Sequence, residues 1–408
     1  MLTTCTNVLI TSSLLMTGTV EEGPAWYRGN THTHTLWSDG DAPPEHAVKW
    51  YVDNEYDFLV LSDHNLMQQG ETWFEIAKGG RLTPEKVEGL GRDFGEDWAE
   101  TREEDGKTEM RLRTLDELKE RFESAGDFIL IPGEEVTDRY RLAEVHINGL
   151  NLAGPIKPQH GDSVQETIQN NLDAIIKHGK ENDRQVLAHL NHPNFRKSLG
   201  ASNLAEMKGE RFFEVYNGHR SVENERIGDR PSLEEVWDRA LTMRLRDGAG
   251  DGGLLYGLAT DDAHDHYVVD AVSVPGRGWI MVRADSLDAD SIITAMKKGD
   301  FYASSGVELE DITHDGGTLT IHIKEEPGVQ YLTEFLGTSL GEGDVGTPGQ
   351  VLAITNANPA SYTFDGDELY VRARVKSTRL HPRPYAEGDL EMAWIQPVQP
   401  VKEDSKGD

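Results

Sequence analysis

Short, mostly apolar runs alternate with helix-like segments from residue 26 to about residue 304, and this rhythm constrains the fold more than any other feature of the chain. The runs are FLVLSDH, FILIPGEEV, EVHINGLNL, QVLAHLNHP, FFEVYNG, LYGLATDDAH and GWIMVRA. Near-continuous apolar strands are typical of parallel strands buried on both faces. Strands that alternate with helices predict α/β architecture, and seven or eight such units favour a barrel.

The segments between the runs carry helix-start signals. Ser or Thr followed three residues later by Glu predicts a capping box at three places: Ser163 and Glu166, Thr114 and Glu117, and Ser232 and Glu235. After the first of these, Gly179 stands where a helix C-cap is expected. These signals support helices between the strands.

Three parts of the chain depart from the rhythm. Residues 66 to about 112 are charged and contain several glycines, which indicates an inserted helical excursion, either a solvated decoration or a lid beside a substrate. From 305 to 400, β-rich runs separated by Gly, Asp and Pro turns predict a small all-β, sandwich-like domain. Residues 401–408 form a polar tail.

The N-terminal segment, residues 1–25, leaves two alternatives open. NVLITSSLLMTGTV is apolar enough for the core of a signal peptide, but no Lys or Arg precedes Arg28. The stretch is also too short and too polar to span a bilayer. It is either a weak export signal or a plain edge or disordered segment, so both a cytoplasmic and an exported protein agree with the sequence.

The 408-residue chain carries a formal net charge of −32. Such a field repels nucleic acid and anionic membrane surfaces, so we expect a small-molecule substrate, no nucleic-acid partner and no stable membrane insertion. If that substrate is an anion, it needs local positive charge from metal ions or an arginine. The single cysteine, Cys5, excludes an intramolecular disulfide and a thiolate zinc site. The oligomeric state is not indicated.

Polar side chains that can bind metal ions collect where the apolar runs end. They are His32, His34, Asp39, Asp63, His64, Glu134, Glu135, His146, His189, His192, Glu214, Asp261, Asp262 and His264. Because the carboxyl ends of parallel barrel strands meet at one face, we expect these residues to converge on one mouth. Alternate residues of a strand point to the same side, so His32 and His34 should aim at one point.

Each of these residues has an ordinary structural explanation when it is taken alone, such as a hydrogen-bonded histidine, a solvated Glu-Glu loop or an Asp-Asp helix cap. The same combination at several strand ends favours a shared metal site. Imidazole and carboxylate ligands without thiolate suit zinc, iron or manganese, and carboxylates able to bridge indicate more than one ion. The other histidines are interpreted as helix-surface or second-domain residues: His46, His178, His314, His322 and His381.

Other catalytic signatures are absent from the sequence. It contains no Gly-rich phosphate loop, no HExxH zinc motif, no GxSxG elbow and no dinucleotide fingerprint. Metal-assisted hydrolysis is therefore the chemistry that the pattern favours.

The motifs HTHT with SDG, LSDHN, PGEEVT, a following histidine, NHP and DDAH occur in this order. Together they resemble the polymerase and histidinol phosphatase (PHP) family of metal-dependent phosphoesterases. FEVYNG and the order of the runs are most similar to the carbaryl-hydrolase-like branch of that family. The resemblance covers residues 26–304 and implies a distorted seven-stranded β/α barrel.

The resemblance also implies two or three divalent ions, of zinc, manganese or iron. The implied ligands are His32, His34, Asp262 and Glu135 for the first ion, Glu135, His146 and His192 for the second, and Asp39, His64 and His264 for the third. Asp39 stands where some members have histidine, and this difference concerns whether the third ion is bound.

Local choices among neighbours follow from the family pattern as well. Gly-x-Glu selects Glu135 over Glu134, and a ligand directly before proline selects His192 over His189. The Asp-x-His spacing selects Asp262 over Asp261.

The chemistry that follows is hydrolysis by a metal-bridged hydroxide, with attack on phosphorus or on a carbonyl carbon. Glu135, Asp262 and His264 are expected to be the catalytic members of the ligand set. His219 or His266 is the candidate proton donor for the leaving group.

Three residues near the last strands are expected to contact the substrate: Asn217, His219 and Arg277. Arg277 would grip two phosphate oxygens through its guanidinium fork, or alternatively it pairs with a surface acid. The leading function is thus a phosphoesterase. The alternatives are an ester, carbamate or amide hydrolase on the same metals, and a non-catalytic scaffold stabilised by metal.

Overall fold

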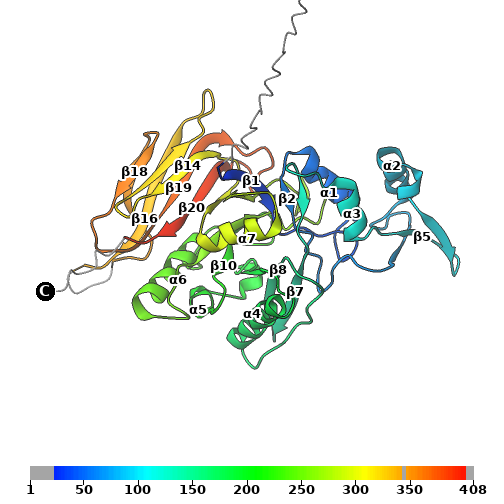
Figure 1. The fold of residues 1–408 in the computed structure, drawn as a ribbon, viewed down its shortest axis with the longest axis horizontal. Coiled ribbons are helices and arrows are strands. Elements are labelled where there is room, and N and C mark those ends of the chain that lie inside the picture. The colour runs from blue at the N-terminus through cyan, green and yellow to red at the C-terminus, as the bar shows by residue number, and fades with distance from the viewer. Residues whose placement is uncertain (1–22, 342–345, 401–408) are drawn as a thin grey trace, which may run out of the picture.

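The computed structural model describes residues 23–341 and 346–400, which form a mixed α/β fold around two large sheets (Figure 1). In spatial order the first sheet consists of β17 (Gln350–Thr355), β16 (Tyr331–Ser339), β19 (Glu368–Leu380), β20 (Leu390–Val398), β13 (Phe301–Ser304), β12 (Trp279–Ala284), β1 (Ala25–Asn30), β2 (Phe58–Leu59) and β6 (Ile129–Leu130). The second consists of β11 (Tyr256–Thr260), β10 (Phe212–Asn217), β9 (Leu187–Leu190), β8 (Ala143–Leu150) and β7 (Gly133–Tyr140). The tail at 401–408 and most of the N-terminal segment lie outside the described residues.

The strands that surround the predicted mouth are parallel in two groups, β1-β2-β6 and β9-β10-β11. Isolated parallel bridges join the groups, one between Thr33 and Ala263 and one between His64 and Glu135. The described strands therefore make an interrupted ring, and their ladders do not close into one barrel. The mixed α/β class is confirmed, while the seven-stranded barrel stays a prediction.

Two of the predicted strands depart from the parallel arrangement expected from their apolar runs: β8 is antiparallel to both β7 and β9, and β12 is antiparallel to β1. β7 and β8 form an antiparallel hairpin, because only Arg141 and Leu142 connect them and a parallel crossover needs a dozen or more residues. His146 consequently does not end a strand but sits early in β8, opposite Thr137 of β7. This register still brings His146 to the same edge as Glu135.

Seven helices flank the sheets (Figure 1): α1 (Pro44–Asp53), α2 (Pro84–Phe94), α3 (Leu115–Phe122), α4 (Val164–Glu181), α5 (Ala201–Ala205), α6 (Leu233–Asp247) and α7 (Ala289–Lys298) among the described residues. Short 3-10 turns occupy Glu96–Trp98 and Phe195–Lys197. α4 packs on β7, β8 and β9, α6 on β10 and β19, and α7 on β12. Among the described residues, no helix combines the length and apolar character that a membrane crossing needs.

The predicted helix caps are correct in two cases and partly wrong in the third. α3 and α6 begin with complete capping boxes. At α4 Ser163 accepts the Glu166 N–H as expected, but the Glu166 carboxylate accepts the N–H of Asp162 instead of Ser163. Gly179 is not the C-cap, because α4 continues to Glu181. Its missing side chain leaves room for Val186, which an added Cβ would approach to 2.6 Å.

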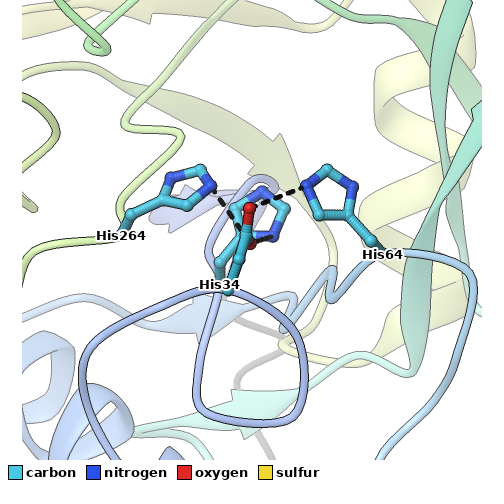
Figure 2. A group of neighbouring side chains, drawn as sticks. His34, His64 and His264 are labelled. Carbon is cyan, nitrogen blue, oxygen red and sulfur yellow. Dashed lines mark ion pairs between the residues drawn. The ribbon is translucent and has the colours of Figure 1, made fainter. Parts of the chain in front are cut away.

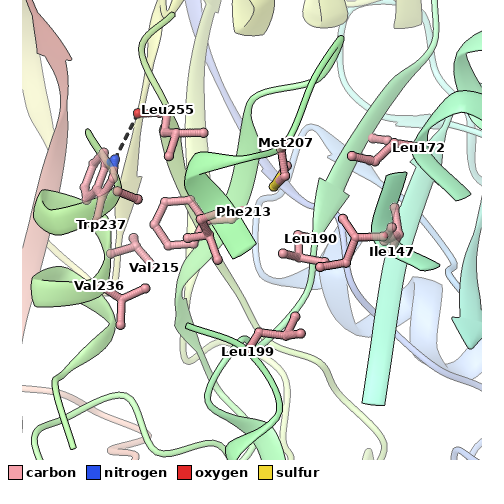
Figure 3. Close-up of a cluster of buried hydrophobic side chains, with 14 of the residues drawn as sticks. Ile147, Leu172, Leu190, Leu199, Met207, Phe213, Val215, Val236, Trp237 and Leu255 are labelled. Atoms are coloured by element: carbon pink, nitrogen blue, oxygen red, sulfur yellow. Dashed lines mark hydrogen bonds between the residues drawn. The ribbon is translucent and has the colours of Figure 1, made fainter. Parts of the chain in front are cut away.

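A cluster of buried apolar side chains lies between β8, β9 and β10 on one side and α4 and α6 on the other (Figure 3). Leu190 and Phe213 come from neighbouring strands, and Trp237 packs on them from α6. The Trp237 indole N–H donates to the Leu255 carbonyl at 2.9 Å, so this large side chain is buried with its polar atom satisfied. The cluster fixes the strands whose ends carry the predicted ligands.

The excursion at 66–112 contains α2 and a three-stranded sheet of β3 (Trp73–Glu75), β5 (Lys107–Arg111) and β4 (Thr101–Glu104), and it extends away from the large sheets (Figure 1). It also supports the loop that follows β1. Arg81 donates to the carbonyls of Ser38 at 2.8 Å and Gly40 at 3.0 Å, and Lys86 donates to that of Asp41 at 2.7 Å.

In the C-terminal region a small sheet packs on the nine-stranded sheet, and the sandwich-like domain over 305–400 stays a prediction. β14 (Leu309–His314), β15 (Thr318–Ile323) and β18 (Ala360–Thr363) form a three-stranded sheet, whose Leu319 and Ile321 pack against Phe335, Val371 and Val375 of the nine-stranded sheet. The large sheet runs without a break past residue 304, because β13 pairs with β12 on one side and β20 on the other. The domain boundary near 304 stays a prediction.

Candidate metal centre

The nine predicted ligands lie together at the edge where β1, β2, β7, β9 and β11 end or pass. They are His32, His34, Asp39, His64, Glu135, His146, His192, Asp262 and His264, and each lies within 4 Å of another member across a nitrogen–oxygen pair. The inner members are buried, whereas the Asp39 side chain is 56% exposed. The cluster thus opens to solvent on the Asp39 side.

Glu135 lies at the centre of the cluster. Its Oε1 is 3.1 Å from His146 Nδ1 and 3.4 Å from both His32 Nε2 and His192 Nε2. Its Oε2 is 2.8 Å from His64 Nδ1 and 3.5 Å from the Nε2 of a further histidine, His34. A carboxylate with imidazoles on both oxygens has the placement of a bridging ligand.

Asp262 closes the inner part from the opposite side. Its Oδ1 lies 3.2 Å from the Nε2 atoms of both His32 and His34. Both Asp262 and His192 have positive φ, at 49° and 24°, which is uncommon for residues other than glycine. Strained backbone of this kind is typical of functional sites, where neighbouring structure must stabilise it.

The outer part of the cluster surrounds Asp39. Oδ1 of Asp39 is 3.3 Å from His264 Nε2 and 3.7 Å from His34 Nδ1, and Oδ2 is 3.4 Å from His64 Nε2. In Figure 2 the rings of His264 and His64 stand on either side of His34, and dashed lines mark the ion pairs. Ring centroids of His34 and His264 are only 4.1 Å apart. Three imidazoles around one carboxylate make a compact nitrogen and oxygen donor set.

Four overlapping groups of ligand atoms lie close enough to share an ion. They are His34, Asp39, His64 and His264; His32, His34 and Glu135; His32, His192 and Asp262; and His64, Glu135 and His146. The outer group contains the three residues expected around the third ion. The inner groups divide differently, since His192 joins His32 and Asp262 rather than His146.

The donor set fits divalent ions on an observation independent of the motifs. The buried atoms His32 Nε2, His34 Nε2, His146 Nε2 and Glu135 Oε2 have no hydrogen-bond partner among the described residues. A buried polar atom without a partner costs about 1–3 kcal/mol, so four in one cluster require compensation. Metal coordination would satisfy His32 Nε2, His34 Nε2 and Glu135 Oε2, which face the other ligands, and nitrogen and carboxylate donors suit zinc, manganese or iron.

Electrostatics in the cluster keep the carboxylates charged. Burial by itself would raise the pKa of Glu135, but His64, His32 and His146 hold the pKa well below its usual range. The pKa of Asp262 is lowered in the same way, against burial, chiefly by His32 and His34. Both side chains are therefore carboxylates, the form in which they bind metal.

Glu134 and Asp261 do not face the cluster, whereas their neighbours Glu135 and Asp262, which the family pattern selects, do. Glu134 points away from the cluster and accepts the Ile156 N–H. The Asp261 carboxylate accepts the backbone N–H groups of Gly276, Arg277 and Gly278 and the hydroxyl of Tyr51, so it shapes the loop before β12.

His189 was the alternative to His192, and it lies behind His32, with ring centroids 6.4 Å apart. Burial lowers the pKa of His189 to about 4, so this imidazole is neutral at ordinary pH. His192 instead places Nε2 against Glu135.

Glu214 is the functional residue whose importance the strand-end pattern understated. It is fully buried, and its carboxylate accepts from His32 Nδ1 at 2.6 Å, the His192 N–H at 2.7 Å, and Asn217 Nδ2 and Thr260 Oγ1 at 2.8 Å each. A carboxylate on the far nitrogen of a ligating histidine fixes its tautomer and orientation. Its signal in the sequence was an acid inside an otherwise apolar run, FFEVYNG.

Two further polar side chains support the ligands from outside. Asp63 accepts from Thr35 N and Oγ1, Ser38 Oγ and Gln68 Nε2, which pins the loop between His34 and Asp39. Asn191 donates to Glu135 Oε1 at 2.7 Å. Sequence spacing alone could not assign these supporting roles, because each side chain contacts residues in or after a different strand from its own.

The residues expected to contact substrate occupy different positions. Asn217 is buried and donates to Asp262 Oδ2 at 3.2 Å as well as to Glu214, so it orients ligands instead of facing a substrate. His219 lies beside the cluster, with its ring centroid 5.5 Å from that of His264. His266 lies behind His34, whose carbonyl is 3.0 Å from His266 Nε2.

Arg277 does not have the position that an anion clamp requires. It is 1% exposed, and its guanidinium donates to the carbonyls of Gly218, Val272 and Ala271 at 2.7, 2.6 and 2.9 Å. Its charge is thus used to fix two loops, and it forms no ion pair with a surface acid either. The expected contact with two phosphate oxygens is not supported, because the fork is already occupied by backbone.

Comparisons with known proteins give low similarity. No family model matches the chain, and no curated protein matches it. A two-domain protein of Bacteroides vulgatus, described as containing a predicted PHP-like metal-dependent phosphoesterase, is 14% identical over 92% of this chain and 96% of its own, with a TM-score of 0.41.

Two other solved structures show partial similarity. An amidohydrolase of Chromobacterium violaceum is 14% identical over 59% of this chain and 88% of its own, with a TM-score of 0.26. A protein of Bifidobacterium adolescentis, named as a metal-dependent phosphoesterase, is 15% identical over 60% of this chain and 89% of its own, with a TM-score of 0.30.

Proposed function

We propose that this chain is a metal-dependent hydrolase with a di- or trinuclear centre, and that phosphate esters are its substrates. The proposal includes the PHP-type barrel over residues 26–304, which the motif order predicts, and the all-β domain over 305–400, which its β-rich runs predict. The supporting observation is the convergence of buried imidazole nitrogens on the Glu135 and Asp262 carboxylates, where His32 Nε2 and His34 Nε2 have no hydrogen-bond partner among the described residues. Bound cations would compensate the free-energy cost of burying these polar atoms together.

The inner residues would hold one or two ions, and the outer group around Asp39 would hold another. Bound divalent ions would supply a water-derived nucleophile at neutral pH and would neutralise charge that develops on the attacked group. Glu135 would bridge, since its two oxygens face different histidines. Entry is from the side of Asp39, whose side chain is the most exposed of the ligand set.

The chain's own residues orient this donor set. Glu214 accepts the His32 Nδ1–H, so His32 Nε2 is left unprotonated and aimed at the cluster. Asn217 donates to both Asp262 and Glu214 and therefore couples one proposed ligand to the carboxylate that orients another.

His219 is the proposed proton donor to the leaving group. Its Nδ1 accepts the Ser221 N–H at 3.1 Å, which places the proton of the neutral ring on Nε2. Its ring stands next to His264 on the side of the cluster that includes Asp39. His266 is less suited, because its Nε2 is engaged with the His34 carbonyl inside the protein.

One observation favours a second candidate, hydrolysis of an ester, carbamate or amide. The arginine expected to grip a phosphate is buried elsewhere and bonded to carbonyls. Attack on a carbonyl carbon needs no anion clamp, so the same donor set could serve that reaction.

The test combines metal analysis with paired substrates. Protein reconstituted with Zn²⁺, Mn²⁺ or Fe²⁺ is assayed on 4-nitrophenyl phosphate and 4-nitrophenyl acetate, with elemental analysis of bound metal. Turnover of the phosphate that is lost in His32→Ala and competitively inhibited by inorganic phosphate supports the phosphoesterase. Ester turnover alone, with the same dependence on His32, supports the second candidate. Stoichiometric metal without turnover of either substrate class or of a wider panel would leave a non-catalytic scaffold.

A further inference from the structure

A cavity of about 510 Å³ lies between two loops at some remove from the ligand set. One wall comes from the connection between β11 and β12, at Val269, Asp270 and Arg277, and the other from the loop 381–389, which joins β19 to β20. None of the nine predicted metal ligands lines this cavity. Its size is that of a site for a small organic molecule.

Two guanidinium groups in the cavity wall have no carboxylate partner. Arg277 and Arg383 both line it and neither forms an ion pair, whereas the nearby Arg220 is paired with Asp270 at 2.5 Å. The Arg383 guanidinium has a long contact to the Pro275 carbonyl, at 3.5 Å, and lies over the Trp50 ring, 4.9 Å from its centroid. The Nε–H of Arg277 is buried without a hydrogen bond, although its other nitrogens are satisfied. A buried donor in this state calls for an acceptor.

The rest of the lining is apolar at the mouth and acidic on one side. Val269 and Leu380 are 68% and 65% exposed, unusually high values for aliphatic side chains. Glu387 and Asp389 also line the cavity and make no ion pair with its arginines. These two acids disfavour a multiply charged anion, because its second charge would meet like charge at short range.

We propose that this cavity binds a small organic monocarboxylate. The carboxylate would take hydrogen bonds from Arg383, with the positive charge of the buried Arg277 behind it, and the apolar part would lie against Val269 and Leu380. This site is separate from the metal centre and does not depend on the proposed hydrolase function.

The test uses benzoate as the probe and benzamide as its neutral counterpart of similar shape. Binding to the metal-loaded full chain is followed by saturation-transfer NMR and titration calorimetry. Benzoate should bind and benzamide should not. Val269→Asp places a negative charge at the mouth and should weaken benzoate binding about tenfold. Val268→Asp is the matched control, because Val268 is 61% exposed but does not line the cavity, and it should leave binding unchanged.

A second arm separates this cavity from the metals. Glu135→Gln disturbs the metal centre and should leave benzoate binding intact, with the effect of Val269→Asp preserved in the double variant. If benzoate binding is lost in Glu135→Gln and is unchanged in Val269→Asp, benzoate binds at the metal centre and the proposal is overturned. Equal binding of benzoate and benzamide, or no binding of benzoate at tens of millimolar concentration, would overturn it as well.

Discussion

Replacing Glu214 by glutamine should weaken metal binding while leaving every ligand in place. The carboxylate accepts four hydrogen bonds, two on each oxygen: His32 Nδ1 and Thr260 on Oε1, and the His192 N–H and Asn217 on Oε2. An amide has one oxygen and one NH₂ group, so in either orientation two buried donors face another donor.

The magnitude follows from these contacts. Each donor left without an acceptor costs about 1–3 kcal/mol, so the free energy of unfolding should fall by several kcal/mol at most. If the NH₂ group faces His32, its ring must take the tautomer protonated on Nε2, which opposes coordination. Loss of such an orienting carboxylate typically costs about 10–100-fold in metal affinity. We expect a loss in that range, with activity partly restored at high metal concentration.

The assay is metal titration against a competing chelator, with unfolding measured in parallel. Glu210→Gln is the matched control, because Glu210 is also a buried carboxyl beside β10, and burial raises its pKa to about 7, but it makes no contact with the ligand set. That variant should keep wild-type metal affinity. If Glu214→Gln lowers stability without changing metal affinity, Glu214 only supports the fold and the orientation argument fails.

Three further predictions follow from the same geometry. Glu135→Gln should abolish turnover and lower bound metal, while Glu134→Gln should be mild; elemental analysis and activity of the pair check this, and the reverse pattern would contradict the central place of Glu135. Arg372→Met should lower the free energy of unfolding by about 3–5 kcal/mol, because it leaves Asp238, bonded to Arg372 at 2.7 Å, as an uncompensated buried charge; chemical denaturation measures it, and a change below 1 kcal/mol would contradict the buried pair. Arg277→Lys should lower the melting temperature and leave KM for aryl phosphates unchanged, since the single ammonium nitrogen of lysine cannot reach carbonyls that arginine contacts from two separate nitrogens; a raised KM in a stable variant would return this residue to the substrate site.

Much of the ligand set could be predicted from sequence because strand ends have a fixed geometric meaning. His32 and His34, two residues apart, aim at one point by the period of extended backbone, and DDAH reaches the same point through the bridge between Thr33 and Ala263. The choices of Glu135, His192 and Asp262 over their neighbours rested on motif order, and the side-chain contacts agree with each.

Other features depended on tertiary contacts that no local pattern encodes. An apolar run does not reveal strand direction, so the antiparallel turn between β7 and β8, which brings His146 opposite Thr137, could not be predicted from it. Arg277 was expected at the substrate because it follows the last site strand, but only the folded chain shows that the carbonyls of Gly218 and Ala271 surround it. Glu214 was noticed as a polar residue in an apolar run, yet its four donors come from the ends of four strands, β1, β9, β10 and β11.

Segments outside the strand ring hold the loops at the mouth of the centre. On one side, Arg81 of the excursion donates to the carbonyls that flank Asp39, so the exposed ligand is fixed by a part of the chain that looks like decoration in the sequence.

On the other side, the loop 381–389 grips the segment that carries His219. Tyr385 donates its hydroxyl proton to the Val222 carbonyl at 2.6 Å, and Arg220 donates to the Tyr385 carbonyl at 2.9 Å. Loops are ordinarily more mobile than the strands they connect. Metal ligands on a mobile loop would not keep the geometry that metal binding needs. Here Arg81 holds the Asp39 loop to the excursion, and hydrogen bonds of Arg220 and Tyr385 hold the His219 segment to the loop 381–389. The excursion therefore restricts the loop that carries Asp39, and the β-rich region restricts the segment that carries His219. The strands of the site do not by themselves fix either loop.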